Sequence, residues 1–207
     1  MNHDELLELM RSRRSIRHFT EQAVSRDDLN IMLEAARWAP SNHNRQPWKF
    51  TVLDDRTRIR ELAEQVRLGM EIKVKSLPEV AAAHAVGLVT HGTFFADAPV
   101  VIVAMHKLPI AAAAPLWEGM LHPELVSGEP LSVAMAIQNL LLAAHALGLG
   151  ACVMTAPLLA ADLSEKLQVP PGFGITALVA VGYPDGIPQA PRRKSLEHIA
   201  EFGPPLR

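Results

Sequence analysis

Three arginines and a serine lie close together near the start of the chain, in the segment RRSIR at residues 13–17. In an extended or turning segment alternate residues share a face, so Arg13, Ser15 and Arg17 are expected to point the same way. Two guanidinium forks and a hydroxyl suit a phosphate monoester, which is dianionic near neutral pH and favours bidentate donors. A solvated basic turn after a helix is the other interpretation of this cluster.

A second polar segment, SNHNRQP at residues 41–47, is stiffened by Pro40 on one side and Pro47 on the other. Its serine, asparagine and glutamine side chains offer both hydrogen-bond donors and acceptors. A ligand with alternating carbonyls and ring nitrogens, such as the pyrimidine edge of a flavin, needs that combination. A capped turn between a helix and a strand uses the same residue types, so both interpretations stay open.

A third group of charges lies in the C-terminal tail, where Arg192, Arg193 and Lys194 are consecutive. Taken alone, this group is typical of a solvated basic run. Chain termini often lie close together, however, so the tail could also converge with the N-terminal arginines.

Composition excludes several classes of protein. The formal net charge of −2 disfavours a general nucleic-acid binder. The single cysteine, Cys152, permits no intramolecular disulfide, which fits a reducing compartment. The longest apolar stretch, residues 133–149, is interrupted by polar residues and falls short of the ~20 residues that a membrane span needs. We expect a cytoplasmic protein with neither a nucleic-acid partner nor a membrane partner.

Motifs for a catalytic side chain are missing from the sequence. It contains no glycine-rich dinucleotide fingerprint and no Walker loop, and its histidines have no metal-ligand spacing. Cys152 lies in an apolar segment, where a thiol is typically inert. We therefore expect no metal and no catalytic residue, and if the protein is an enzyme a cofactor carries the chemistry.

The elements that must position these residues follow from local patterns. Ser25 and Asp28 form a capping-box pattern, with Val24 and Leu29 placed as a hydrophobic staple, at the start of a helix that Pro40 ends near Trp38. Periodicity and β-branched runs predict helices at 4–12, 57–72 and 162–172, and strands at 48–53, 98–105, 151–154 and 175–184.

A long helix is expected within residues 131–151, LSVAMAIQNLLLAAHALGLGA, and it is apolar nearly all round. Such a helix must be buried on every side. A chain of 207 residues has little room to surround it, so we expect it to lie at a subunit interface.

Taken together, RRSIRHF and the later AARWAPSNHNRQPWKF resemble the signature of the nitroreductase family of FMN-dependent oxidoreductases. AIQNLLLAAHALGLGACVMTAP, and VAVGYP followed by PRRKSLEHI, resemble its later landmarks in the same order. The resemblance spans nearly the whole chain and implies one domain over residues 1–207. It also implies an α+β fold, a three-layer α/β/α sandwich with a mainly antiparallel central sheet, and a homodimer with two FMN sites at the interface.

The resemblance further implies which residues bind FMN. The phosphate would be held by side chains from both ends of the chain: Arg13, Ser15 and Arg17, with Arg14 contributing near the ring or through its backbone, and Arg193 with Arg192 or Lys194. The flavin ring would be contacted by Pro40, Ser41, Asn42 and Asn44 of the partner subunit, by Met154, Thr155 and Ala156 near N5, and by His91 at the pyrimidine.

The implied activity is ping-pong hydride transfer through flavin N5, from NADH or NADPH to a nitroaromatic, a quinone or an enone-like acceptor. Residues 107–129 correspond to the variable region that shapes the substrate side, where Trp117 could lie over the pocket. Some family members carry an acidic residue near N5, where this chain has Met154–Ala156.

Other activities remain open at this point. Relatives of the same fold dehalogenate aromatic rings, fragment reduced flavin or oxidise peptide heterocycles. A flavin-binding sensor or reservoir without turnover is a further alternative, and a basic-arm binding module without flavin is the last.

Overall fold

The computed structural model describes residues 2–78, 81, 87, 89–109, 128–160 and 162–203. Within these ranges the strands are β1 (Trp48–Leu53), β2 (Val100–Lys107), β3 (Gly150–Met154) and β4 (Phe173–Gly182). They form one sheet in the order β1-β2-β4-β3, and every neighbouring pair is antiparallel. The four strands expected from the sequence are therefore all confirmed.

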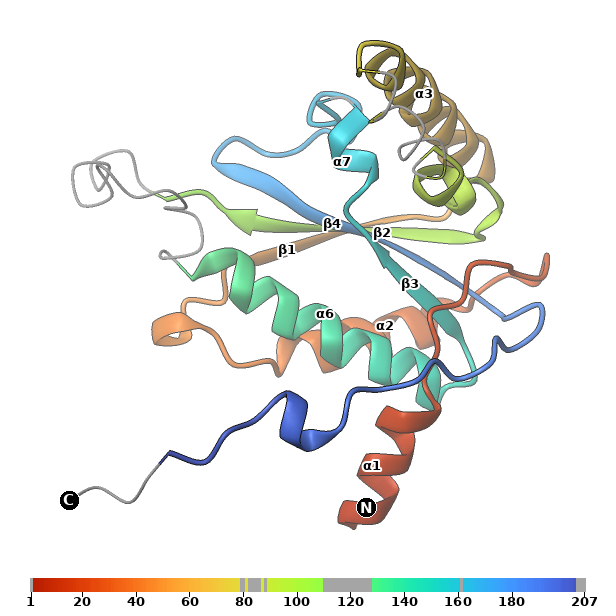
Figure 1. The fold of residues 1–207 in the computed structure, drawn as a ribbon. Coiled ribbons are helices and arrows are strands. Elements are labelled where there is room, and N and C mark those ends of the chain that lie inside the picture. The colour runs from red at the N-terminus through yellow and green to blue at the C-terminus, as the bar shows by residue number, and fades with distance from the viewer. Residues whose placement is uncertain are drawn as a thin grey trace.

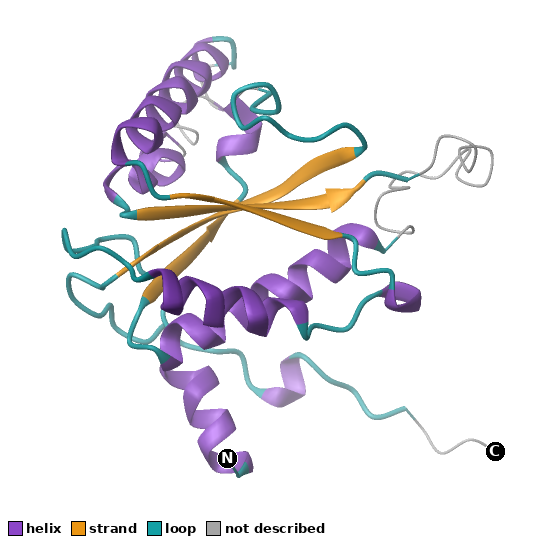
Figure 2. Cartoon of the chain, turned by 180° about the vertical axis from the view of Figure 1, so that it is seen from behind, coloured by secondary structure: helices purple, strands orange, loops and turns teal. Residues whose placement is uncertain are grey.

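Helices cover both faces of this sheet (Figures 1 and 2). The longer ones are α1 (His3–Ser12), α2 (Arg26–Arg37), α3 (Arg56–Lys75) and α6 (Glu129–Ala146), and the shorter ones are α7 (Pro157–Ala160), η1 (Asn42–Asn44), η2 (Phe94–Asp97) and η4 (Leu196–His198). The α2 and α6 helices lie on one face, and α3 and α7 lie on the other. The expected three-layer α/β/α arrangement with an antiparallel sheet is confirmed.

The β2 strand shows why the sheet lies between two layers. Its side chains point alternately to the two faces. Val100 and Ile102 pack with α2 and α6, whereas Val101 and Val103 pack with α3 and α7. All of them are buried, so an unbroken apolar run in the sequence corresponds to a strand covered on both faces.

The start of α2 follows the expected capping pattern. Ser25 Oγ accepts a hydrogen bond from the Asp28 backbone N–H at 3.0 Å and donates one to the Asp28 carboxylate at 2.7 Å. Val24 packs against the same core as Leu29, as the hydrophobic staple predicts. Local capping chemistry therefore sets where this helix begins.

The prediction of a short helix at residues 162–172 is wrong. This stretch forms a series of turns, in which Val169 N–H donates to Ser164 C=O at 2.8 Å and Gln168 N–H donates to Glu165 C=O at 3.1 Å. That pairing is a Schellman motif, with Gln168 in the left-handed region at φ 51°. The motif ends the helical turn at once, and Pro170 follows. The turn therefore cannot continue into a regular helix.

The α6 helix is buried along one side within a single chain. Val133, Ile137 and Leu140 belong to the core beneath the sheet. On the opposite side Leu131 is 53% exposed and Met135 is 40% exposed. A single chain therefore does not bury this helix on every side. Its position at a subunit interface stays a prediction.

After β4 the chain continues as a C-terminal arm, residues 185–203, which runs past α1 and α6 (Figure 1). Every residue of the arm is exposed, including the apolar Ile187, Leu196, Ile199 and Phe202. In the described part of the chain, no helix combines the length and the apolar character needed to cross a membrane.

Candidate functional site

The basic segment 13–17 lies along the free edge of β3. Ile16 N–H donates to Ala151 C=O at 3.1 Å, and Ser15 pairs with Ala151 in an isolated parallel bridge. A Cβ atom at Gly150 would lie only 2.6 Å from Ile16 Cβ, so this close approach requires glycine. The sequence RRSIR is therefore held against the sheet as an extended segment.

Residues of this segment act on the thiol of Cys152. Burial raises the pKa of the Cys152 thiol, while the Arg17 charge, the Ser15 side chain and the Arg13 charge each act to lower it. All three residues therefore act on one buried group, and the shared orientation of their side chains stays a prediction from the alternation. Because burial dominates, the thiol stays neutral at pH 7 and does not compensate the positive charges.

Arg14 points elsewhere. Its Nη1 donates to the backbone carbonyls of Arg13, at 2.9 Å, and Arg11, so it caps the C-terminal end of α1. Its Nε is buried and has no hydrogen-bond partner among the described residues. Arg14 also borders a cavity of about 120 Å³ that Ser12 and His145 line. The Arg14 guanidinium is thus engaged at the end of α1.

His145 joins the end of α6 to α1. Its Nε2 lies 2.9 Å from Ser12 Oγ, and Ser12 Oγ donates to Glu8 C=O at 2.7 Å, so the imidazole N–H donates to the serine. Burial lowers the pKa of His145 below its ordinary value, and the Arg13 and Arg14 charges add to the effect. His145 is therefore neutral at pH 7.

Stability is expected to fall as the pH drops below 6.5, the ordinary pKa of histidine. The unfolded chain takes up a proton at His145 near that pH, whereas the folded state takes it up only at lower pH. This contribution is fully present above the unfolded pKa and is lost as the pH falls toward the folded pKa. Thermal melts of wild type and His145→Asn between about pH 5 and 8 check it, and a stability difference that does not change with pH contradicts it.

The 41–47 loop has an unusual backbone. His43, Asn44 and Gln46 all lie in the left-handed region, with φ of 49°, 52° and 48°. Within the loop, Ser41 Oγ accepts from Gln46 N–H at 3.0 Å and Asn44 Oδ1 accepts from Gln46 Nε2 at 3.3 Å. Pro40, Asn42 and Asn44 are exposed, so this segment presents polar groups at the surface.

The loop docks on the first turn of α6. Asn42 N–H donates to Ser132 Oγ at 3.2 Å, and Arg45 pairs with Glu129 at 3.3 Å. Sequence reasoning missed Glu129 and Ser132. The available signal was their polar character at the start of an otherwise apolar helix.

At the C-terminal end of β3, Met154 is buried, Thr155 is exposed and Ala156 is half-buried. A Cβ atom placed on Gly92 would lie 3.8 Å from Ala156 Cβ, so the segment carrying His91 is a neighbour of this strand end. The His91 ring is exposed, and its Nδ1 lies 2.6 Å from Gly87 C=O.

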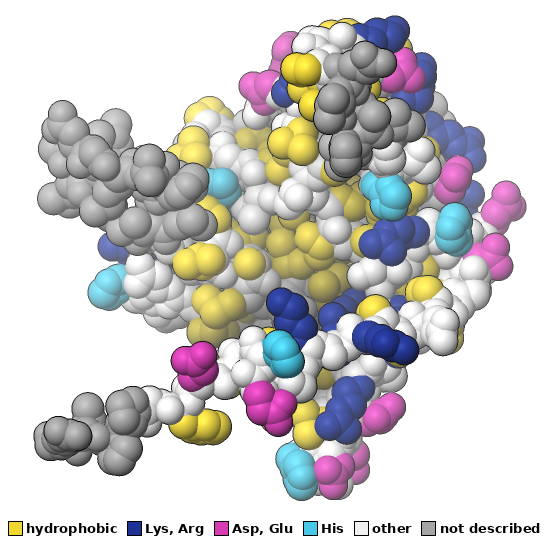
Figure 3. Space-filling view, viewed as in Figure 1, with side chains coloured by type: hydrophobic (Ala, Val, Ile, Leu, Met, Phe, Trp, Pro, Cys, Tyr) yellow, Lys and Arg dark blue, Asp and Glu magenta, His cyan; other side chains and the backbone are white. Residues whose placement is uncertain are grey.

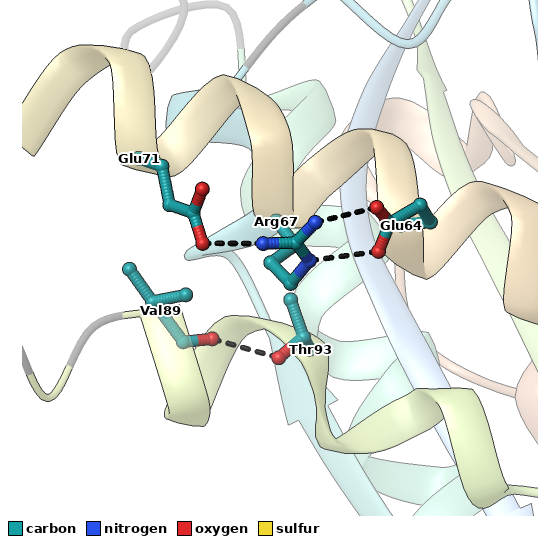
Figure 4. A network of polar contacts seen from close by, with 5 residues as sticks. All are labelled: Glu64, Arg67, Glu71, Val89 and Thr93. Carbon is teal, nitrogen blue, oxygen red and sulfur yellow. Dashed lines mark hydrogen bonds and ion pairs between the residues drawn. The ribbon is translucent and has the colours of Figure 1, made fainter.

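Arg17 connects the basic segment with the same region. Its guanidinium lies 5.9 Å from the centre of the Phe94 ring, a cation–π geometry. The helical turn that precedes Phe94, from Val89 to Thr93, is closed by a hydrogen bond from Thr93 Oγ1 to Val89 C=O and lies beside Arg67 of α3 (Figure 4). Three segments distant in sequence, around residues 15, 92 and 155, therefore meet at one edge of the sheet.

A hollow lies on this side of the molecule, with hydrophobic side chains in its floor and Lys and Arg side chains at its edge (Figure 3). Arg192 and Arg193 lie in the exposed C-terminal arm, and neither forms a hydrogen bond or ion pair with any described residue. Most of the expected substrate-side region, residues 110–127 with Trp117, lies outside the described residues.

Solved structures share this architecture. A BluB-like flavoprotein from Clostridium difficile superposes with a TM-score of 0.82 at 25% identity, and the match covers 96% of this chain and 99% of that chain. A nitroreductase with bound FMN from Desulfitobacterium hafniense superposes with a TM-score of 0.74 at 22% identity and covers 98% and 100% of the two chains.

Sequence relatives agree with the fold. An iodotyrosine deiodinase of Haliscomenobacter hydrossis is 31% identical over 183 residues, covering 87% of this chain and 79% of the relative. A protein of Archaeoglobus fulgidus with the provisional name NADH dehydrogenase/NAD(P)H nitroreductase is 28% identical over 184 residues, covering 87% and 86%. The pattern of the nitroreductase family matches residues 10–183. The chain belongs to the nitroreductase family.

Proposed function

We propose that this protein is an FMN-dependent oxidoreductase, which takes electrons from NADH or NADPH and passes them to a small acceptor such as a nitroaromatic or a quinone. The observation that carries the proposal is the extended basic segment with Arg13, Ser15 and Arg17, whose backbone is held along the edge of β3. The bound FMN of the Desulfitobacterium hafniense nitroreductase supports the same cofactor.

The residues present fit a phosphorylated flavin. Arg13 and Arg17 form no ion pair with a carboxylate among the described residues, so their guanidinium groups are available to an anion. A phosphate monoester can accept from both forks and from the Ser15 hydroxyl. The hydrophobic floor of the adjacent hollow suits an aromatic ring system.

Residues of this chain would orient and enclose the cofactor. We propose that Arg193, with Arg192, closes the phosphate site from the arm, and that Arg14 supports Arg13 by capping α1. The ring side of the site would be formed by Met154, Thr155, Ala156 and His91, together with Pro40, Ser41, Asn42 and Asn44 of a partner subunit. FMN, when bound, supplies the hydride-transfer chemistry, so no catalytic side chain and no metal are assigned.

We further propose a homodimer. The uncovered side of α6 exposes Leu131 and Met135, and α1 exposes Leu7 and Met10. The apolar side chains of the C-terminal arm are likewise exposed, with no cover from the described residues. Apolar surface of this extent typically marks an interface. We also place the protein in the cytoplasm, because its single cysteine, Cys152, is a free thiol.

The test of this function is an absorbance spectrum of freshly purified protein, repeated after adding NADH or NADPH without oxygen. We expect a flavin band that bleaches on reduction, with the faster of the two donors identifying the physiological one. A colourless protein that added FMN does not stabilise would contradict the proposal. A flavin band that neither donor bleaches would instead support a sensor or reservoir.

Reductive dehalogenation of an aromatic ring is a second candidate. An iodotyrosine deiodinase of Thermotoga neapolitana is 28% identical over 198 residues, covering 95% of this chain and 98% of that protein. Parallel turnover assays with iodotyrosine, a nitroaromatic and a quinone would separate the two activities. Fragmentation of the flavin itself, an activity that the family resemblance leaves open, would show as loss of the flavin spectrum in oxygen after reduction.

A further inference from the structure

Within the described residues, the buried polar side chains of the core are Glu129, which is 7% exposed, and Ser132, which is 1% exposed. Both lie in the first turn of α6. Burying a polar group costs free energy unless a hydrogen bond or an ion pair compensates it. The hydrogen-bond and ion-pair partners of Glu129 and Ser132 therefore indicate what these two polar side chains do in an otherwise apolar helix.

Ser132 holds the start of the 41–47 loop. Its hydroxyl donates to Gly128 C=O at 2.8 Å, so its oxygen accepts the hydrogen bond from Asn42 N–H at 3.2 Å. Gly128 is left-handed, with φ of 78°, and a Cβ atom there would lie 3.2 Å from Asn42 Nδ2. Asn42 is thus packed against the helix start and hydrogen-bonded to it.

Glu129 holds the other end of the loop. Its Oε1 lies 3.3 Å from Arg45 Nη1, and the glutamate side chain is 9% exposed while the arginine is 60% exposed. The second oxygen, Oε2, is buried without a hydrogen-bond partner among the described residues. A carboxylate in this setting has lost most of its hydration, so its attraction for Arg45 is stronger than that of a surface pair.

The strained residues lie between these two contacts and directly after the second. His43, Asn44 and Gln46 occupy the left-handed region without being glycines. Such a strained backbone persists only when contacts with its surroundings hold it in place. Backbone strain of this kind is common at ligand-binding sites. Outside the loop, Lys107 N–H of β2 donates to Pro47 C=O at 2.9 Å, and α6 supplies the restraints at Asn42 and Arg45, on either side of His43 and Asn44.

We propose that Glu129 and Ser132 are positioning residues that lock the 41–47 loop into the shape in which its polar groups meet the pyrimidine edge of a flavin. The proposal rests on the proposed function, because it takes the loop as part of the FMN site. Neither residue touches the cofactor; both act through the loop backbone and Arg45. The affinity for FMN is therefore set partly from a helix start about ninety positions away in sequence.

The first measurement uses the full-length protein without FMN. Hydrogen exchange of the backbone amides of residues 41–46 is compared among wild type, Ser132→Ala, Glu129→Gln and the control Glu64→Gln. The control also removes a carboxylate from an arginine pair, on α3 at the opposite face of the sheet. We expect the loop amides to exchange about 10-fold faster in both α6 variants and at the wild-type rate in the control.

The second measurement is an FMN titration of the same proteins by flavin fluorescence. We expect Kd to rise about 10-fold for Ser132→Ala and Glu129→Gln, with partial rescue by Glu129→Asp, and no change for the control. Unchanged loop exchange in both α6 variants, or unchanged Kd despite faster exchange, would overturn the proposal. Wild-type protein that binds no FMN would overturn the proposed function, while the exchange rates would still decide whether these residues lock the loop.

Discussion

Replacing Arg17 by alanine is expected to weaken FMN binding by about 100-fold, since a charged hydrogen bond contributes roughly 1.5–3 kcal/mol. Its guanidinium is exposed beside the Ser15 carbonyl, at 3.4 Å, and above the Phe94 ring. No carboxylate among the described residues pairs with it, so its removal leaves no buried charge behind and should leave folding intact. Fluorescence titration of FMN measures the change.

Two further variants separate geometry from charge. Arg17→Lys retains the positive charge but loses the planar fork, so an intermediate loss of about 10-fold is expected. Arg11→Ala removes the same charge from an exposed position in the last turn of α1 and should bind FMN as wild type does. Equal Kd values for Arg17→Ala and Arg11→Ala would contradict the assignment of Arg17 to the phosphate site.

Replacing Met135 by aspartate is expected to convert the dimer to monomers and to abolish FMN binding with it. Met135 is 40% exposed on the uncovered side of α6, next to Leu131 at 53%. Burying a carboxylate in an apolar interface costs several kcal/mol, which raises the dimer Kd by about 1,000-fold or more. FMN binding should fall too, because the 41–47 loop is proposed to come from the partner subunit. Sedimentation velocity at micromolar protein checks the assembly.

Ile72→Asp is the matched control for this experiment. Ile72 is 69% exposed on α3, in the other helix layer, so the substitution places the same charge on an exposed apolar position outside the proposed interface. This variant should stay dimeric and bind FMN. A monomeric wild type would contradict the dimer itself, whereas a dimeric Met135→Asp would contradict only the assignment of this face of α6.

Much of the fold could be predicted because the decisive interactions are local. The β-branched runs became strands, and the Ser25 cap and its staple set the start of α2. The extended form of the basic segment is observed as well, and the one-sided arrangement of Arg13, Ser15 and Arg17 remains a prediction from alternation. The prediction of a helix at 162–172 was wrong because Gln168, in the left-handed conformation, ends the helical turn. A glutamine gives no sequence signal for that conformation.

The sequence by itself determined these local elements and the chemical types of the site residues, since capping, alternation and apolar periodicity depend on neighbours a few positions apart. Only the tertiary structure decided that the basic segment lies along β3, that Arg14 turns away to cap α1, and that Glu129 and Ser132 hold a loop about ninety positions earlier. The physical reason is that such contacts depend on how distant elements pack, and packing brings together atoms whose separation along the chain carries no local signal.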